Sequence, residues 1–130
     1  MIINYRSHAN EAAEVVHEAR GFGVEAIAVQ GDVGSTDDCE RLVEECVRAF
    51  GRIDVLIANA AVTVRKPFLE LSGSEWQRVQ DVSLGGVFHT TQAACREMIK
   101  RGAGCVIAIG SVHAVLAFKN SIAYNRRRPD

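Results

Sequence analysis

Short apolar runs that alternate with helical patterns constrain the fold of this chain more than any other feature. The runs are rich in β-branched residues and too short for helices, and they lie at 1–5, 24–30, 53–58 and 105–109. Between the first two runs, Ala12, Val15, Val16 and Ala19 recur with the period of an amphipathic helix. Strands that alternate with helices form right-handed crossovers and a parallel sheet. The sequence therefore predicts a single α/β domain over residues 1–130.

Two further helices are predicted between the remaining strands. Ser35 and Asp38 form a capping pattern, and the apolar stripe that follows ends at Gly51. A longer helix is predicted over 74–101, with Ser74 and Gln77 at its start. Gly85 and Gly86 in its middle predict either a bend or the close approach of another helix. Its apolar positions are Trp76, Val79, Val87, Cys95, Met98 and Ile99.

The composition excludes several classes of protein. With 48% apolar residues, 24% charged residues and a net charge of −1, nothing favours nucleic acid or an acidic membrane as a partner. We find no run as long as a membrane span and no signal-peptide pattern. The cysteines show no CxxC spacing, so we predict buried thiols in a reducing compartment and no metal site. We therefore expect a cytoplasmic protein.

The segment from Cys105 to Tyr124 carries the candidate chemistry. Ser111 stands at the carboxyl end of a predicted buried strand, and Tyr124 follows in the same segment. Ligands of open α/β sheets bind at that edge, so the two hydroxyls are predicted to meet there. Taken singly, each of these residues is more often a surface or capping residue.

The segment IGSVHAVLAFKNSIAY resembles the active-site segment of the short-chain dehydrogenase/reductase family, in its glucose dehydrogenase and 3-oxoacyl reductase branch. The resemblance implies that Tyr124 exchanges a proton and that Ser111 holds the substrate oxygen. It also implies two changes in the proton relay, because Ser83 replaces the family's Asn and Arg128 replaces the family's Lys. A phenol titrates near pH 10 and needs a fixed positive charge to react near neutrality. Arg supplies charge but does not readily lose a proton, so an impaired relay is predicted.

The resemblance also implies a site for a nicotinamide cofactor. No acidic residue ends the first strand, and Arg6 stands where family members that prefer NADP place a basic residue. NADP(H) is therefore predicted over NAD(H), although Arg6 alone could be a solvated loop charge and Asp32 a cap. No G-x-x-x-G-x-G run occurs in the 130 residues, so the phosphate cradle is missing and weakened cofactor binding is predicted. The residues that the resemblance places beside the cofactor are Arg6, Ser7, Asp32, Val33, Asn59 and Ala60.

The fold implied by the resemblance is an incomplete Rossmann-like doubly wound parallel sheet of four strands with crossover helices. The family's first strand, which would lie between the strands at 1–5 and 53–58, and its last strands are expected to be missing. About 30 residues, a strand, a turn and a helix, are expected to be missing in front. We expect the two strand pairs either to form a compressed four-stranded sheet or to remain partly molten. The tail at 126–130 suggests a shifted reading frame or a truncated gene.

Two functions of different classes follow. The first is an oxidoreductase that moves hydride between NADP(H) and an alcohol or carbonyl compound. The second is a non-catalytic remnant or interaction module that acts through the helix 74–101, which in the family packs against its counterpart in a neighbouring subunit. The resemblance therefore also predicts a homo-oligomer formed through this helix.

Overall fold

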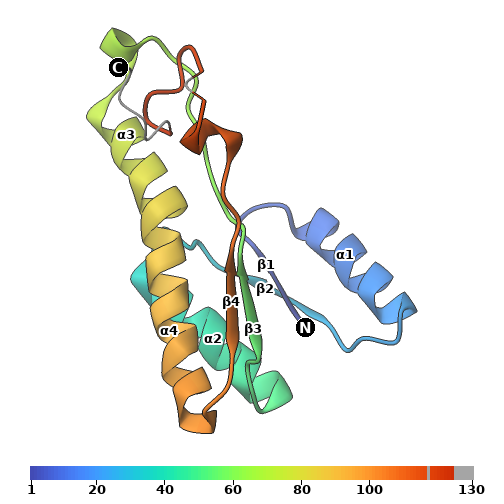
Figure 1. The fold of residues 1–130 in the computed structure, drawn as a ribbon. Helices are drawn as coiled ribbons and strands as arrows, with labels where there is room; N and C mark the ends of the chain where they lie inside the picture. The colour runs from blue at the N-terminus through green and yellow to red at the C-terminus, as the bar shows by residue number, and fades with distance from the viewer. Residues whose placement is uncertain (117, 125–130) are drawn as a thin grey trace.

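The structure, a computed structural model, describes residues 1–116 and 118–124 (Figure 1). Its helices and strands alternate as predicted, with strand starts up to three residues later than the apolar runs suggest. The strands are β1 (Ile2–Tyr5), β2 (Ile27–Gln30), β3 (Val55–Ala58) and β4 (Cys105–Ala108). The helices are α1 (Ala9–Gly21), α2 (Thr36–Phe50), α3 (Gly73–Gln80) and α4 (Gly86–Arg101), with a π-helical turn η2 (Asp81–Gly85) and 3-10 turns η1 (Phe68–Glu70) and η3 (Val112–Ala114).

The strands form two separate parallel pairs. β1 pairs with β2 from Ile2 opposite Ile27 to Tyr5 opposite Gln30. β3 pairs with β4 in the same sense. The compressed four-stranded sheet is therefore not formed, and β1 and β3 lie in separate sheets. The chain has an incomplete Rossmann-like α/β fold.

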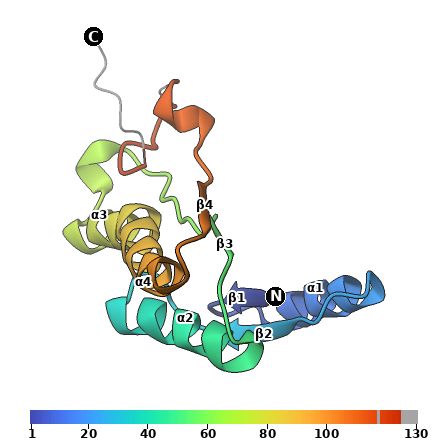
Figure 2. The same ribbon diagram turned by 60° about the horizontal axis from the view of Figure 1, so that its bottom comes forward.

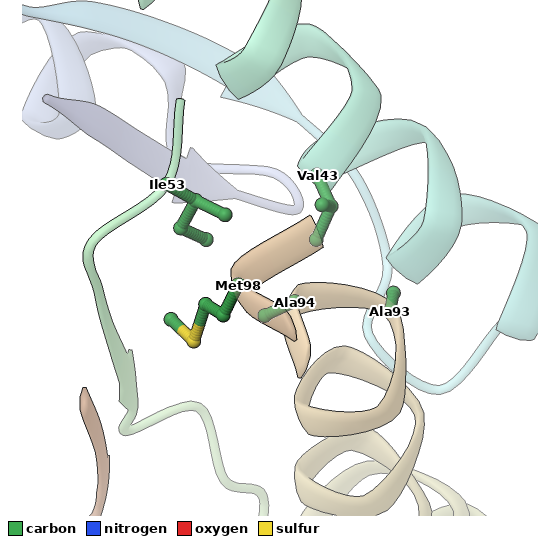
Figure 3. Close-up of a cluster of buried hydrophobic side chains, with 5 residues drawn as sticks. All are labelled: Val43, Ile53, Ala93, Ala94 and Met98. Atoms are coloured by element: carbon green, nitrogen blue, oxygen red, sulfur yellow. The ribbon is translucent and has the colours of Figure 1, made fainter. Parts of the chain in front are cut away.

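Helix packing joins the two strand pairs. Helices α2 and α4 lie side by side (Figure 2). Their interface holds the larger buried cluster (Figure 3), whose members are Val43, Ile53, Ala93, Ala94 and Met98. Helix α1 packs on β1 and β2, where Val16, Ala19 and Ala26 form a second, smaller cluster. Because α2 follows β2 and α4 precedes β4, the α2–α4 interface ties the two pairs together.

Helix ends match the sequence in one case and differ in another. Ser35 caps α2 as predicted, since its side chain accepts the N–H of Asp38, and Gly51 ends that helix in the left-handed conformation with φ of 73°. The start of the next helix was predicted wrongly at Ser74. Ser72 caps α3 instead, in a reciprocal capping box with Glu75.

The helix predicted over 74–101 is continuous but contains a π-helical turn. This turn, η2, ends at Gly85 and separates α3 from α4. Gly86 permits a close approach, as predicted, but the neighbour is a loop and not a helix. A Cβ atom added at Gly86 would lie 2.8 Å from Cγ2 of Val33 in the loop that follows β2.

The strand β4 was predicted to be buried, and this is wrong. All of its residues are exposed, including Cys105, whose thiol was also predicted to be buried. On the neighbouring strand, Leu56 packs against the larger cluster, whereas Val55 and Ile57 on the opposite face are 52% and 60% exposed. Alternate strand residues point to opposite faces. Only one face of β3 is therefore covered by the described elements.

Burial along the long helix follows the predicted apolar stripe only in part. Val79 and Met98 are buried as predicted, but Ile99 is 77% exposed and Trp76 is half-exposed. No helix within the described residues has the length and hydrophobicity to cross a bilayer.

Candidate active site

Ser111 and Tyr124 both contact His113. The hydroxyl of Ser111 accepts the backbone N–H of His113 at 3.2 Å and thereby caps η3. The imidazole of His113 meets the ring of Tyr124 edge-on, with centroids 5.2 Å apart, and stacks on Phe118 at 4.3 Å. The structure therefore brings the two predicted hydroxyl residues into contact with one histidine, beyond the carboxyl end of β4.

The segment that carries Tyr124 is tied to the end of α3. The side-chain amide of Gln80 donates to the carbonyl oxygen of Ala123 at 2.8 Å. The N–H of Tyr124 donates to the carbonyl of Ser121, and the N–H of Lys66 donates to the carbonyl of Asn120. Sequence reasoning missed Gln80, because a polar residue on a helix gives no signal of a partner 43 residues away.

Ser83 lies in η2 and fixes the loop that follows β3. Its hydroxyl donates to the carbonyl oxygen of Val62 at 3.0 Å and accepts the N–H of the same residue at 3.1 Å. The predicted cofactor residues Asn59 and Ala60 are exposed and directly precede this anchored position. The only proton of the Ser83 hydroxyl is therefore used by the backbone. A role for Ser83 in a relay stays a prediction.

The other predicted cofactor residues lie at the carboxyl ends of β1 and β2. Arg6 lines a solvent-open cavity of about 660 Å³ together with residues 27–32 and part of α2. The side-chain amide of Gln30 donates to the carbonyl oxygen of Arg6 at 3.0 Å. Ser7 contacts Nδ1 of His8 at 3.3 Å. The positive charge of Arg6 therefore lines a space large enough for a nucleotide.

Asp32 is the centre of the turn after β2. Its carboxylate binds both guanidinium nitrogens of Arg78, at 2.8 and 3.0 Å, and accepts the N–H of Gly34 at 2.9 Å. Burial alone would raise the pKa of Asp32. The hydrogen bond and charge of Arg78, the N–H of Gly34 and the charge of Arg6 outweigh burial and hold this pKa below its ordinary value. Sequence reasoning missed Arg78, which lies 46 residues from Asp32.

Val33 is held between two helices. The thiol of Cys39 donates to its carbonyl oxygen at 3.2 Å, and Gly86 faces it from α4. Burial raises the pKa of Cys39 to about 11, so the thiol stays protonated and is a structural donor.

The predicted site residues thus fall into two groups that the α3–η2–α4 helix connects. Gln80 and Ser83 contact the group near β3 and β4, whereas Arg78 and Gly86 contact the group near β2. The predicted position Arg128 lies outside the described residues. Within those residues, no group of three or more His, Cys, Asp or Glu side chains could hold a metal ion.

Parallel strand–helix units with polar residues gathered at the carboxyl ends of the strands define a Rossmann-like α/β protein. The model of the short chain dehydrogenase family matches residues 1–125. The chain belongs to this family of oxidoreductases.

Relatives of known sequence support the assignment. The chain is 35% identical over 125 residues to a 3-oxoacyl-[acyl-carrier-protein] reductase from Synechocystis, covering 96% of this chain and 51% of that protein. It is 34% identical over 110 residues to the reductase of the same name from Staphylococcus aureus, covering 85% of this chain and 45% of that protein. The chain therefore spans about half the length of these relatives.

Solved structures give the same result. A gluconate 5-dehydrogenase from Burkholderia cenocepacia, in complex with NADP and tartrate, is 32% identical with a TM-score of 0.83, covering 95% of this chain and 48% of that one. An acetoin dehydrogenase from Salmonella typhimurium is 30% identical with a TM-score of 0.87, covering 95% of this chain and 49% of that one.

Proposed function

We propose that this chain belongs to an NADP(H)-dependent oxidoreductase that interconverts an alcohol and a carbonyl compound. The observation that carries the proposal is the contact of Ser111 and Tyr124 with His113, beyond the carboxyl end of β4. A serine and a tyrosine in contact with one histidine beyond a strand end match the residue types needed where a substrate oxygen gains or loses a proton. Family membership supports the same reaction class.

Ser111 and Tyr124 have different parts in this reaction. Because the Ser111 oxygen accepts a backbone N–H, its own proton points elsewhere and can be donated to a substrate oxygen. Tyr124 gives its phenolic proton to that oxygen in reduction and takes it back in oxidation. The nicotinamide cofactor, when bound, supplies or accepts the hydride at the substrate carbon.

The preference for NADP(H) is supported by Arg6. Among the residues that the structure describes, no carboxylate forms an ion pair with Arg6, and its charge lines the cavity at β2. A cation without an internal partner can bind a phosphate, and the adenosine end of NADP(H) carries one on its 2′-oxygen. Asp32 and Val33 are proposed to flank the adenine, with Ser7, Asn59 and Ala60 along the cofactor.

Turnover by a tyrosine variant tests the proposed function. NADPH oxidation by the chain is followed by absorbance with a panel of small ketones and 3-oxoacyl thioesters, for the wild type and for Tyr124→Phe. Loss of a positioned proton donor is expected to lower the rate by about 10²- to 10⁴-fold. Phe118→Leu, a neighbouring aromatic change, controls for altered packing. Equal rates for wild type and Tyr124→Phe contradict the assignment of Tyr124.

Association between copies of the chain is a second candidate property. The long helix exposes large apolar side chains along its length, with Leu84 47% and Phe88 58% exposed and Trp76 42% exposed. Scattered apolar residues are ordinary, but several on one helix favour a docking surface for its counterpart in a second copy. Sedimentation over a range of concentrations tests this, and a strictly monomeric chain excludes it.

A further inference from the structure

Charge pairing around the cavity at β2 leaves one arginine without a partner. Charged side chains of both signs line this cavity: Arg6, Arg41, Arg48, Asp32, Asp38 and Glu45. Arg41 binds Asp38 at 2.6 Å, and Arg48 binds Glu45. These pairs leave Arg6 and Asp32 as the remaining charged residues of the lining.

Asp32 forms an ion pair with Arg78, which does not line the cavity. Arg78 in α3 grips both oxygens of the Asp32 carboxylate, and both side chains are about one-third exposed. Arg6 is close enough for its charge to lower the pKa of Asp32, yet it forms no ion pair with any residue in the described part of the chain. Both arginines therefore act on one carboxylate, and only Arg78 binds it.

We propose that Arg78 is a positioning residue for cofactor specificity, which binds Asp32 and so leaves Arg6 available for the 2′-phosphate of NADP(H). This inference rests on the proposed function. Arg6, Asp32 and Arg78 together carry a net charge of +1. Without Arg78 the net charge is zero, and the Asp32 carboxylate is released to turn toward Arg6.

The local geometry is built for a guanidinium. Two parallel N–H···O bonds need a planar fork, which Lys lacks. Gly34 leaves the space for it, because a Cβ atom added there would lie 2.7 Å from Nη1 of Arg78. Gly34→Ala is therefore a second way to disturb the Arg78–Asp32 pair without removing either charge.

Two nucleotides that differ only in the 2′-phosphate test the inference. Calorimetry on the full chain gives Kd for 2′,5′-ADP and for 5′-AMP, neither of which needs the glycine-rich phosphate cradle. The ratio of the two Kd values measures recognition of the 2′-phosphate. Arg78→Gln is expected to reduce this ratio by about five- to tenfold at low salt, because the released Asp32 carboxylate then turns toward Arg6 and opposes its binding of the 2′-phosphate.

Three comparisons make the result specific. Arg96→Gln is the matched control, since Arg96 pairs with Glu40 at 2.7 Å on an exposed surface, and it is expected to leave the ratio unchanged. Arg6→Gln is expected to abolish the preference, and adding Arg78→Gln to it is expected to change the ratio no further. Arg78→Lys keeps the charge but lacks the planar fork, so it is expected to lower the ratio less than Arg78→Gln does. If Arg78→Gln does not fold, Gly34→Ala takes its place as the disrupting change.

The outcomes separate the inference from the proposed function. If Arg6→Gln lowers the ratio while Arg78→Gln or Gly34→Ala leaves it at the wild-type value, the role of Arg78 is overturned and the NADP(H) site stands. If the wild-type chain binds the two nucleotides equally, or binds neither, both the preference for NADP(H) and the role of Arg78 are overturned.

Discussion

Met98 provides the sharpest test of how the two strand pairs are held together. It is 5% exposed and lies in the cluster between α2 and α4 (Figure 3). Met98→Ala removes three heavy atoms, a transfer loss of about 2.4 kcal/mol at about 0.8 kcal/mol for each methylene-sized group. The residual cavity brings the expected loss of unfolding free energy to about 2–5 kcal/mol. A whole domain is stable by only about 5–15 kcal/mol, so the effect is large.

A substitution of Gly104 tests the same packing in a second way. A Cβ atom added there would lie 2.4 Å from Sδ, 2.5 Å from Cγ and 2.7 Å from Cβ of Met98. Gly104→Ala is therefore expected to cost about 1–3 kcal/mol through overpacking. In the Met98→Ala background the Sδ and Cγ collisions disappear, so the cost of Gly104→Ala is expected to fall, with a coupling of about 0.5–3 kcal/mol.

Urea unfolding followed by far-UV circular dichroism gives these free energies. A loss of about 3 kcal/mol moves the midpoint by about 1–3 M for a slope of about 1–3 kcal/mol per molar. Ile99→Ala is the matched control, because Ile99 is the next residue of α4 and is 77% exposed, so a change within about 0.5 kcal/mol is expected. Equal losses of unfolding free energy for Met98→Ala and Ile99→Ala would refute the packing described here. So would a cost of Gly104→Ala that is the same with and without Met98→Ala.

Two further predictions concern the start of α3 and the loop after β3. The hydrogen bond from Lys66, together with the N–H and hydroxyl of Ser72, lowers the pKa of Glu75 to about 2 from 4.5. A carboxyl group whose pKa is lowered in the folded state stabilises the fold at pH values above its unfolded pKa. This contribution is expected to be lost as the pH falls from about 4.5 to about 2. Glu75→Gln is therefore expected to flatten the pH dependence of the unfolding midpoint in that range. Ser83→Ala leaves the N–H and carbonyl of Val62 without their partner and is expected to cost about 1–3 kcal/mol in urea unfolding, whereas Ser83→Thr retains most of the stability. A Ser83→Ala chain as stable as Ser83→Thr would show that water replaces the hydroxyl.

Local patterns in the sequence predicted the order and type of the elements well. Helical periodicity located α2, and the residues at its two ends predicted where it begins and ends. The Ser35 side chain accepts the N–H of Asp38, and Gly51 adopts a positive φ. The cap of α3 was missed by two residues because several serines compete there, and only Ser72 forms the reciprocal bonds with Glu75.

Burial could not be predicted from the same patterns. The apolar run of β4 is typical of a strand covered on both faces, yet Ile107 is 43% exposed, because what packs on the second face is a property of other elements. The same holds for Ile99, which belongs to the apolar pattern of the long helix but points away from the α2–α4 cluster.

The sequence by itself determined the alternation of strands and helices, which follows from periodicity along the chain. The resemblance of its motifs indicated the family and the residues of the candidate site. The tertiary structure alone decided which partner each site residue has. It pairs Asp32 with Arg78, places His113 against Tyr124, and ties Ser83 to the backbone of Val62. Such contacts join residues that are not related by any local period, so only the folded arrangement of the helices brings them together.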